Sequence, residues 1–274
     1  KVLLLALENP GAPRRYIPLI SEQGSHLPVG LVQATLAAYD PGFWDHQGYS
    51  LYGIQEGYHP TLAQILVSDL LLSDEPAGLR RNLRERYLAA LVTAQFGRER
   101  VLEWYLNTAS YGHLAYGAEA AAQTYFGKPA AQLDLAESIA LVSISQAPAI
   151  NPLDVPGVGD SLQGRLIDRL VQLGWIGTDE AVKARTEKLA FRQDLPTSAE
   201  VAPAFDRLAL DQLESLFGID RVERGGLKVI TTLDAGLQDQ VLCVTRTQVL
   251  RLQGNPNPAP TRHGGECQAA GLLP

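Results

Sequence analysis

The sequence has no methionine, only two cysteines, and no apolar stretch as long as the roughly 20 residues that cross a membrane as a helix. It also has no cationic excess, because 23 Lys and Arg stand against 30 Asp and Glu, which gives a net charge of −7. Binding to a nucleic-acid backbone needs clustered Lys and Arg, so this balance argues against a nucleic-acid partner. A solvated acidic surface is the simpler interpretation of the charge.

The scarcity of cysteine limits the metal and redox chemistry that we expect. Cys243 and Cys267 have no metal-ligand spacing around them, so free thiols are expected over a zinc site. The sequence leaves open whether they form a disulfide outside the cytoplasm. His59 and His113 have no carboxylate or cysteine at ligand spacing, which argues against a metal site. Because the chain begins at Lys1 and lacks methionine, we expect a processed product or a piece of a longer protein.

The composition is typical of a soluble globular protein, with 46% apolar and 19% charged residues. Apolar residues recur at helical spacing through most of the chain, so a mainly α fold is predicted. The expected helices cover residues 29–38, 61–72, 79–96, 99–106, 118–123, 135–142, 162–173, 179–189 and 204–217. The third of these has one apolar stripe, the pattern of a helix packed on a core, formed by Leu83, Tyr87, Leu88, Leu91 and Val92.

Changes in composition along the chain predict four parts. Residues 1–28 contain four prolines and few periodic apolar positions, so they form an extended lead-in. Residues 29–195 form the main helical domain, residues 196–254 a small α/β linker region, and residues 255–274 a mobile tail. The linker region is expected to contain a helix and a strand within Gly225–Asp234, where residues 227–232 are rich in β-branched side chains.

The segment from Tyr39 to Gly48 is the most informative part of the sequence. Asp40, Phe43, His46 and Gly48 follow one another at a spacing that resembles the motif Glu-Asp-x-x-Phe-x-x-His-x-Gly. This is the first motif of the family 51 peptidoglycan glycosyltransferases, the chain-polymerising domain of class A penicillin-binding proteins. Tyr39 stands where that family has its catalytic Glu, and a phenol with a pKa of about 10 is a poor proton acceptor near neutral pH.

Further blocks in the family's order extend the resemblance over most of residues 28–240. They are Tyr105-Leu106-Asn107, Ala121 to Lys128, Leu135-Ala136-Glu137, Gln146 to Pro152 and Gly225 to Asp234. The resemblance implies a lysozyme-like, mostly helical domain on the extracytoplasmic side of the cell membrane. It implies lipid II or the glycan strand as substrate, envelope proteins as further partners, and no cofactor, although it leaves room for a divalent cation. The Ser-x-x-Lys and Lys-Thr-Gly motifs of a transpeptidase are absent, so we expect the tail to mark the start of a missing transpeptidase domain.

The family's second and third motifs supply the other candidate site residues. The second, Gly-Ser-Thr-Ile-Thr-Gln-Gln-Leu-x-Lys, keeps Thr61 and Gln64 but has Ser68 in place of its Lys. The third, Arg-Lys-x-x-Glu, keeps Arg81 and Glu85 but loses its Lys, and the pair also has the i,i+4 spacing of a surface ion pair. By this resemblance the candidate catalytic residues are Glu85 and Asp40, and the candidate substrate-binding residues are Phe43, His46, Thr61, Gln64, Arg81 and Arg84.

The replaced residues lead us to expect an impaired glycosyltransferase-type domain that acts as a cell-envelope binding or scaffold module. General-base catalysis contributes roughly 10²- to 10⁴-fold in rate, and a phosphate-binding cation adds further transition-state stabilisation. An active polymerase that uses Asp40 or Asp45 as its base is one alternative. A lytic enzyme with Glu85 as a single acid and a structural subunit of a membrane-associated assembly are the others.

Overall fold

A computed structural model describes residues 14–20, 26–54, 58–73, 75–147, 151–153, 159–192, 202–224, 227, 229–254, 261 and 266–272. The chain divides into two compact units. The larger unit comprises Leu7–Ser198 and Glu223–Gly225, and the smaller unit comprises Lys1–Ala6, Ala199–Val222 and Gly226–Pro274. None of the helices in the described part of the chain combines the length and the apolarity that a membrane crossing requires.

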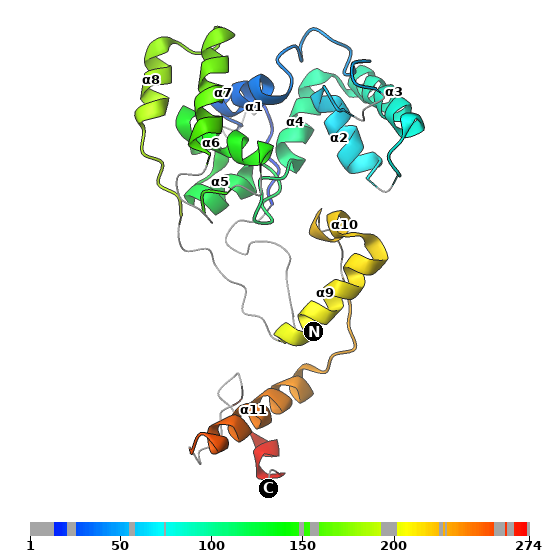
Figure 1. Cartoon of the computed structure of the whole chain (residues 1–274), viewed down its shortest axis with the longest axis vertical. Helices are drawn as coiled ribbons and strands as arrows, with labels where there is room; N and C mark the ends of the chain where they lie inside the picture. Colours follow the sequence, from blue (N-terminus) through cyan, green and yellow to red (C-terminus); the bar gives the residue numbers. More distant parts are fainter. Residues whose placement is uncertain are drawn as a thin grey trace. The chain divides into compact units, whose positions relative to one another are not determined.

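The larger unit is built from helices and loops (Figure 1). Its elements are α1 Val29–Tyr39, α2 Leu62–Leu71, α3 Leu79–Phe96, α4 Arg98–Thr108, α5 Ala118–Phe126, the 3-10 helix η1 Ala130–Gln132, α6 Leu135–Gln146, α7 Asp160–Gln172 and α8 Thr178–Thr186. The helices predicted for this unit are confirmed, with ends that differ by a few residues. The mainly α fold class is also confirmed, since the described residues contain only one isolated β-bridge, between Ser110 and Tyr116.

Local signals set where several of these helices begin and end. Thr61 caps α2, because its Oγ1 accepts a hydrogen bond from the Gln64 backbone N–H at 3.2 Å. Asp134 and Glu137 form a capping box at the start of α6. Gly97 separates α3 from α4 at a φ of +83°, a conformation that residues with a side chain rarely adopt.

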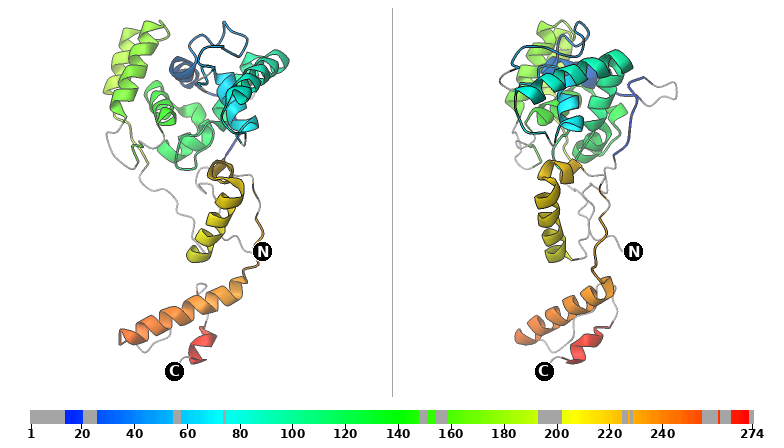
Figure 2. Two further views of the ribbon diagram at one scale, coloured as in Figure 1. Left: turned by 45° about the vertical axis from the view of Figure 1, so that its right-hand side comes forward. Right: turned by 90° about the vertical axis from the view of Figure 1, so that its right-hand side faces the viewer.

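Two groups of helices share one hydrophobic core. In the first group, α1 packs against α6 and α7, and α7 lies alongside α8 (Figures 1 and 2). In the second group, α2 packs against α3 and α4, and α5 contacts α4. The largest fully buried side chains of the core include Tyr111, Tyr125 and Phe43. The segment that joins α1 to α2 connects the two groups, and it carries the first motif.

The described residues of the lead-in, 14–20 and 26–28, lie outside the helices, and α4 holds part of them. The Asn107 side chain accepts a hydrogen bond from the Ile17 backbone N–H at 2.8 Å and donates one to the Ile17 carbonyl at 2.8 Å. One turn earlier on α4, Glu103 accepts a hydrogen bond from the Leu19 backbone N–H at 2.8 Å. Side chains of α4 therefore satisfy lead-in backbone groups as a neighbouring strand would.

The apolar stripe predicted for α3 is confirmed only in part, because Leu88 and Val92 are partly buried against the core whereas the other three residues are exposed. Leu83, Tyr87 and Leu91 are 51%, 65% and 44% exposed. The buried residues of this helix are mostly polar: Asn82, Glu85, Arg86, Ala89 and Thr93. A polar face can be buried when its groups find hydrogen-bond partners, and periodicity alone does not reveal those partners.

The smaller unit contains α9 Pro203–Phe217, most of α10 Ile219–Arg224, α11 Ala235–Leu252 and the 3-10 helix η2 Gln268–Leu272. The helix predicted at residues 204–217 is confirmed. The strand predicted within Gly225–Asp234 is wrong for its described residues, so the region is not the expected α/β linker. An extended segment becomes a strand only when another strand takes up its backbone hydrogen bonds, and none does so among the described residues.

The predicted mobile tail ends in a structured segment. Residues 255–260 and 262–265 lie outside the described residues, but Cys267 is buried and forms a disulfide with Cys243 of α11. The expected free thiols are therefore replaced by a covalent link between α11 and the segment that carries η2.

We predict that this disulfide stabilises the smaller unit. The bridge joins residues 24 positions apart, and closing a loop of that length is worth about 3 kcal/mol in chain-entropy terms. The Cys243→Ser variant should therefore be cleaved faster than the oxidised parent by limited proteolysis between α11 and η2. Reductant should accelerate cleavage of the parent and leave the variant unchanged. Equal cleavage of oxidised parent and variant would contradict this prediction.

Candidate functional site

Asp40 ties the end of α1 to the beginning of α2. Its carboxylate accepts hydrogen bonds from the Leu62 backbone N–H at 3.0 Å and from His46 Nε2 at 2.9 Å. The residue is 4% exposed. A carboxylate beside a helix N-terminus is also stabilised by the helix dipole. Asp40 is therefore occupied as a structural acceptor.

His46 is held through both ring nitrogens. Nδ1 accepts a hydrogen bond from the Gly48 backbone N–H at 3.0 Å, so the neutral ring carries its proton on Nε2 and donates it to Asp40. The His46 carbonyl accepts hydrogen bonds from Arg98 Nε at 2.9 Å and Nη2 at 2.6 Å. Phe43 is 2% exposed and packs edge-on against the ring. These first-motif residues fix the turn between α1 and α2.

Gly48 brings this turn into contact with α3. Its φ is +87°, and a Cβ at this position would lie 2.0 Å from Thr93 Oγ1 and 2.9 Å from the Ala89 carbonyl oxygen. The Gly48 carbonyl also accepts a hydrogen bond from Thr61 Oγ1 at 2.8 Å. The motif requires glycine here because both the backbone conformation and the space exclude a side chain.

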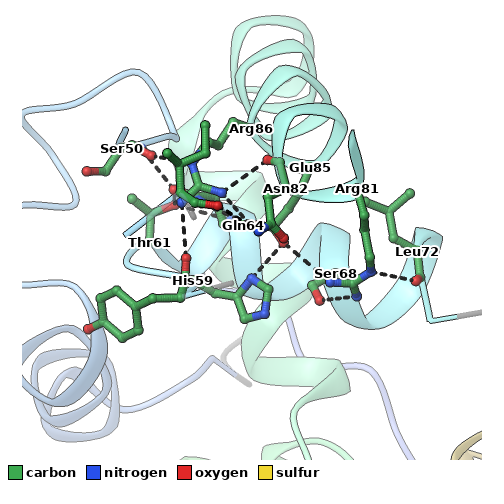
Figure 3. A network of polar contacts seen from close by, with 12 residues as sticks. Ser50, His59, Thr61, Gln64, Ser68, Leu72, Arg81, Asn82, Glu85 and Arg86 are labelled. Carbon is green, nitrogen blue, oxygen red and sulfur yellow. Dashed lines mark hydrogen bonds and ion pairs between the residues drawn. The ribbon is translucent and has the colours of Figure 1, made fainter. Parts of the chain in front are cut away.

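Glu85 lies in a buried polar network that joins α2, α3 and the segment before α2 (Figure 3). It is 0% exposed. Glu85 Oε1 accepts a hydrogen bond from Gln64 Nε2 at 2.8 Å. Gln64 Oε1 in turn accepts one from the Ser50 backbone N–H at 2.8 Å. The second and third motifs are thus linked directly through their Gln and Glu side chains.

The second oxygen of Glu85 faces His59, a residue outside the set predicted for the site. His59 Nδ1 lies 2.6 Å from Glu85 Oε2 as an ion-pair contact, and neither atom has a hydrogen-bond partner among the described residues. Arg81 Nη1 lies 3.9 Å from Oε2 and Arg86 Nη1 lies 3.8 Å from Oε1. The buried carboxylate is therefore surrounded by an imidazole and two guanidinium groups, which offset its charge.

The positions that carry Lys in the family motifs have structural partners here. Ser68 accepts a hydrogen bond from Arg81 Nη2 at 2.8 Å, and Arg81 Nε donates to the Leu72 carbonyl at 3.2 Å (Figure 3). Asn82 donates a hydrogen bond to the Ile54 carbonyl at 2.7 Å. The Arg81 guanidinium is consequently directed toward α2 and the loop that follows it.

Tyr39 occupies the family's base position at the last residue of α1. The Ser145 hydroxyl donates its one hydrogen to the Val142 carbonyl at 2.8 Å, so the Tyr39 hydroxyl donates to Ser145 Oγ at 2.9 Å. The Tyr39 ring packs edge-on against Tyr105 at 5.7 Å between centroids. Burial raises the pKa of Tyr39, and the charge of Asp69 adds to this, against the lowering effect of the hydrogen bonds with Ser145 and Tyr105. The phenol is therefore neutral at physiological pH.

The structure brings some of the sequence-predicted site residues together and separates others. Thr61, Gln64, Arg81 and Glu85 meet in the network of Figure 3. Asp40, Phe43 and His46 form the adjoining turn. Arg84 lies outside both groups, on the exposed side of α3, where it pairs with Glu75.

The surroundings of Glu85 do not fit a divalent cation. No group of three His, Cys, Asp or Glu side chains in the described residues could hold a metal ion. Mg²⁺ and Ca²⁺ prefer several oxygen ligands, whereas nitrogen groups of His59, Arg81 and Arg86 surround the Glu85 carboxylate.

A separate cavity of about 690 Å³ opens between the lead-in and the junction of α3 with α4. Its lining residues are Pro18, Leu19, Ile20, Trp44, Phe96, Gly97, Arg98, Glu99, Arg100 and Glu103. None of the candidate catalytic or substrate-binding residues lines it.

Comparison with known proteins identifies the family. The family model described as Transglycosylase matches residues 20–170. The chain therefore belongs to the transglycosylase family, and the resemblance to the family 51 domain is confirmed.

The relatives and a solved structure carry one name. Penicillin-binding protein 1A of Rickettsia bellii is 29% identical over 242 residues, which cover 82% of this chain and 30% of that protein. The Escherichia coli protein of the same name is 28% identical over 250 residues, with 86% and 29% covered. The crystal structure of penicillin-binding protein 1A from Haemophilus influenzae aligns with a TM-score of 0.43 at 21% identity, covering 85% of this chain and 25% of that one. The chain thus spans about 30% of the length of these curated relatives.

We predict that Gly48 cannot be replaced without loss of stability. Gly48→Ala should lower the free energy of unfolding by about 2 to 4 kcal/mol, because it combines a strained φ with overpacking against Thr93. Gly42→Ala is the matched control, since a Cβ there meets nothing within 4 Å. Urea unfolding of both variants checks the difference, and equal midpoints would contradict it.

Proposed function

We propose that this chain is a peptidoglycan glycosyltransferase-type domain that binds lipid II and the glycan strand but transfers sugar slowly or not at all. Family membership and the shared name of the relatives support the substrate class. The proposal that sugar transfer is slow rests mainly on the surroundings of Tyr39. On this proposal the domain serves the cell envelope chiefly by binding glycan or protein partners.

Proton transfer is the first step that this site handles poorly. Joining a sugar hydroxyl to an anomeric carbon requires a group that takes the acceptor proton. The Tyr39 phenol is neutral and donates its own hydrogen to Ser145. The alternative bases are no better placed, because Asp40 accepts hydrogen bonds from Leu62 and His46, and Asp45 is exposed on the turn.

Stabilisation of the leaving diphosphate is the second weakness. Positive groups fixed around the diphosphate lower the barrier because negative charge develops there during transfer. Ser68 and Asn82 replace the two motif lysines, and Arg81 donates to Ser68 and Leu72. With the motif lysines absent and this guanidinium directed elsewhere, less positive charge faces the substrate.

We also propose that the outward stripe of α3 contacts the membrane that carries the lipid end of the substrate. The stripe is defined by Leu79, Leu83, Tyr87 and Leu91, which are 44–65% exposed. Apolar side chains at i,i+4 spacing along a helix give a continuous surface that can enter the interface of a bilayer. The disulfide supports an oxidising, extracytoplasmic compartment.

We predict that restoring the carboxylate raises the transfer rate. In a lipid II polymerisation assay, Tyr39→Glu should exceed the parent by about 10²-fold, the lower end of general-base effects. Tyr39→Gln is the matched control, since a Gln side chain has the shape of Glu but carries no charge. Robust polymerisation by the parent, or an equal gain for both variants, would contradict the impairment.

A separate prediction concerns the α3 stripe. Leu83→Asp or Tyr87→Asp should weaken binding to phospholipid vesicles at least about tenfold, which corresponds to about 1.4 kcal/mol. Val182→Asp on α8 is the control, because Val182 is an exposed apolar residue of the same unit outside the stripe. Cosedimentation measures the binding, and equal losses for all three variants would argue against contact through α3.

A further inference from the structure

The contact between His59 and Glu85 is the feature of the site that the motifs do not account for. His59 stands just before Pro60 and Thr61, where the family's second motif has its Gly. Its Nδ1 is buried and lies 2.6 Å from Glu85 Oε2. The side chain as a whole is 30% exposed, and Nε2 has no partner among the described residues. Figure 3 shows one ring nitrogen turned toward Glu85 and the other turned away from the network.

The protonation of this pair follows from its geometry. Lone pairs on the two atoms would repel at 2.6 Å, so His59 Nδ1 must carry a hydrogen to lie this close to an ionised Glu85 Oε2. The guanidinium groups of Arg81 and Arg86 each approach an oxygen of the same carboxylate, at 3.9 and 3.8 Å. A neutral His59 then has its lone pair on Nε2, the nitrogen that faces away from the network. A carboxylate that fixes the tautomer of an imidazole in this way makes the opposite nitrogen a proton acceptor.

We propose that His59 is the acid–base residue of this domain, with Glu85 as its positioning residue. This inference rests on the proposed function. It attributes the slow sugar transfer to His59 as the base, in place of the family's Glu at the position of Tyr39. His59 Nε2 takes the proton of the acceptor sugar hydroxyl, and the hydroxyl oxygen forms the new bond to the anomeric carbon of the donor. The bond from that carbon to the diphosphate oxygen breaks, and the diphosphate leaves with the electron pair. The imidazolium returns its proton to water.

The position of His59 explains why it assists only partly. It lies at the start of α2 beside the Glu and Gln of two motifs, whereas the family base belongs to the end of α1. A base that approaches from another direction reaches the hydroxyl less favourably, and small misplacements reduce rates strongly. An imidazole nevertheless accepts a proton near neutral pH, which the buried phenol of Tyr39 does not.

Tautomer measurement tests the pair without relying on activity. In ¹⁵N spectra of the labelled protein, we expect His59 to carry its hydrogen on Nδ1, with the resonance assigned from its loss in His59→Gln. In Glu85→Gln the amide NH₂ should face Nδ1, because Gln64 Nε2 still donates to the oxygen at the Oε1 position. The hydrogen should then move to Nε2. A hydrogen on Nε2 in the parent would overturn the proposal.

Kinetics in two backgrounds test the role. With lipid II as substrate, His59→Gln should reduce the slow transfer of the parent about tenfold or more. In the Tyr39→Glu background the same change should reduce the rate by a smaller factor than in the parent, since the carboxylate has become the base. His26→Gln, at an exposed histidine of the lead-in, is the control in both backgrounds.

The outcomes separate this inference from the proposed function. An unchanged parent rate in His59→Gln overturns the inference, as does undetectable transfer by the parent when Tyr39→Glu is active. Both results leave the proposed function standing. Failure of all variants to bind fluorescent lipid II overturns both, and family-like rates in the parent that His59→Gln abolishes overturn only the impairment.

Discussion

A buried carboxylate must have its charge offset and its oxygens hydrogen-bonded, and Glu85 imposes this requirement on the larger unit. Gln64 donates a hydrogen bond to one oxygen, and His59, Arg81 and Arg86 lie within 4 Å of the carboxylate oxygens. α3 turns its polar side inward to reach them, and Leu79, Leu83, Tyr87 and Leu91 then face outward. The exposed stripe and the polar site are two consequences of the same constraint.

The position of helices could be predicted from the sequence, whereas the direction in which α3 faces could not. Periodicity records which residues share a face, but the choice of the inward face depends on partners from other segments. Arg86 illustrates this, because it donates hydrogen bonds to the carbonyls of Ser50, Tyr52 and Tyr58, far from it in the sequence. His59 could not be predicted as a site residue for the same reason, because it contacts Glu85, which is distant from it in the sequence.

Local strand propensity also gave a wrong prediction in a segment that has no partner strand among the described residues. The β-branched segment after Leu227 has strand propensity, yet no described segment pairs with it, and Val229 and Ile230 are 48% and 74% exposed. The helix that follows had a usable signal. The Asp234 side chain accepts hydrogen bonds from the Gly236 and Leu237 backbone N–H groups at 2.9 and 3.0 Å, which is the geometry of an N-cap.

Motif resemblance located the site but did not distinguish residues that build it from residues that react. Asp40 and Gly48 match the family motif, and the structure shows that both hold elements together. The residues at the replaced positions also have hydrogen-bond partners: Tyr39 is hydrogen-bonded to Ser145, and Ser68 to Arg81. Tyr39 and Ser68 therefore form contacts of their own, and the replacements leave no empty space where the family residues would lie.

This integration limits what any one reversion can restore under the proposed function. A carboxylate at position 39 supplies a proton acceptor at the end of α1, but it leaves Arg81 bound to Ser68 and Leu72. A lysine at position 68 would bring a second cation beside that guanidinium, and like charges in a partly buried place repel. Recovery of the leaving-group cations therefore requires Arg81 to move as well, which couples the second and third motifs energetically.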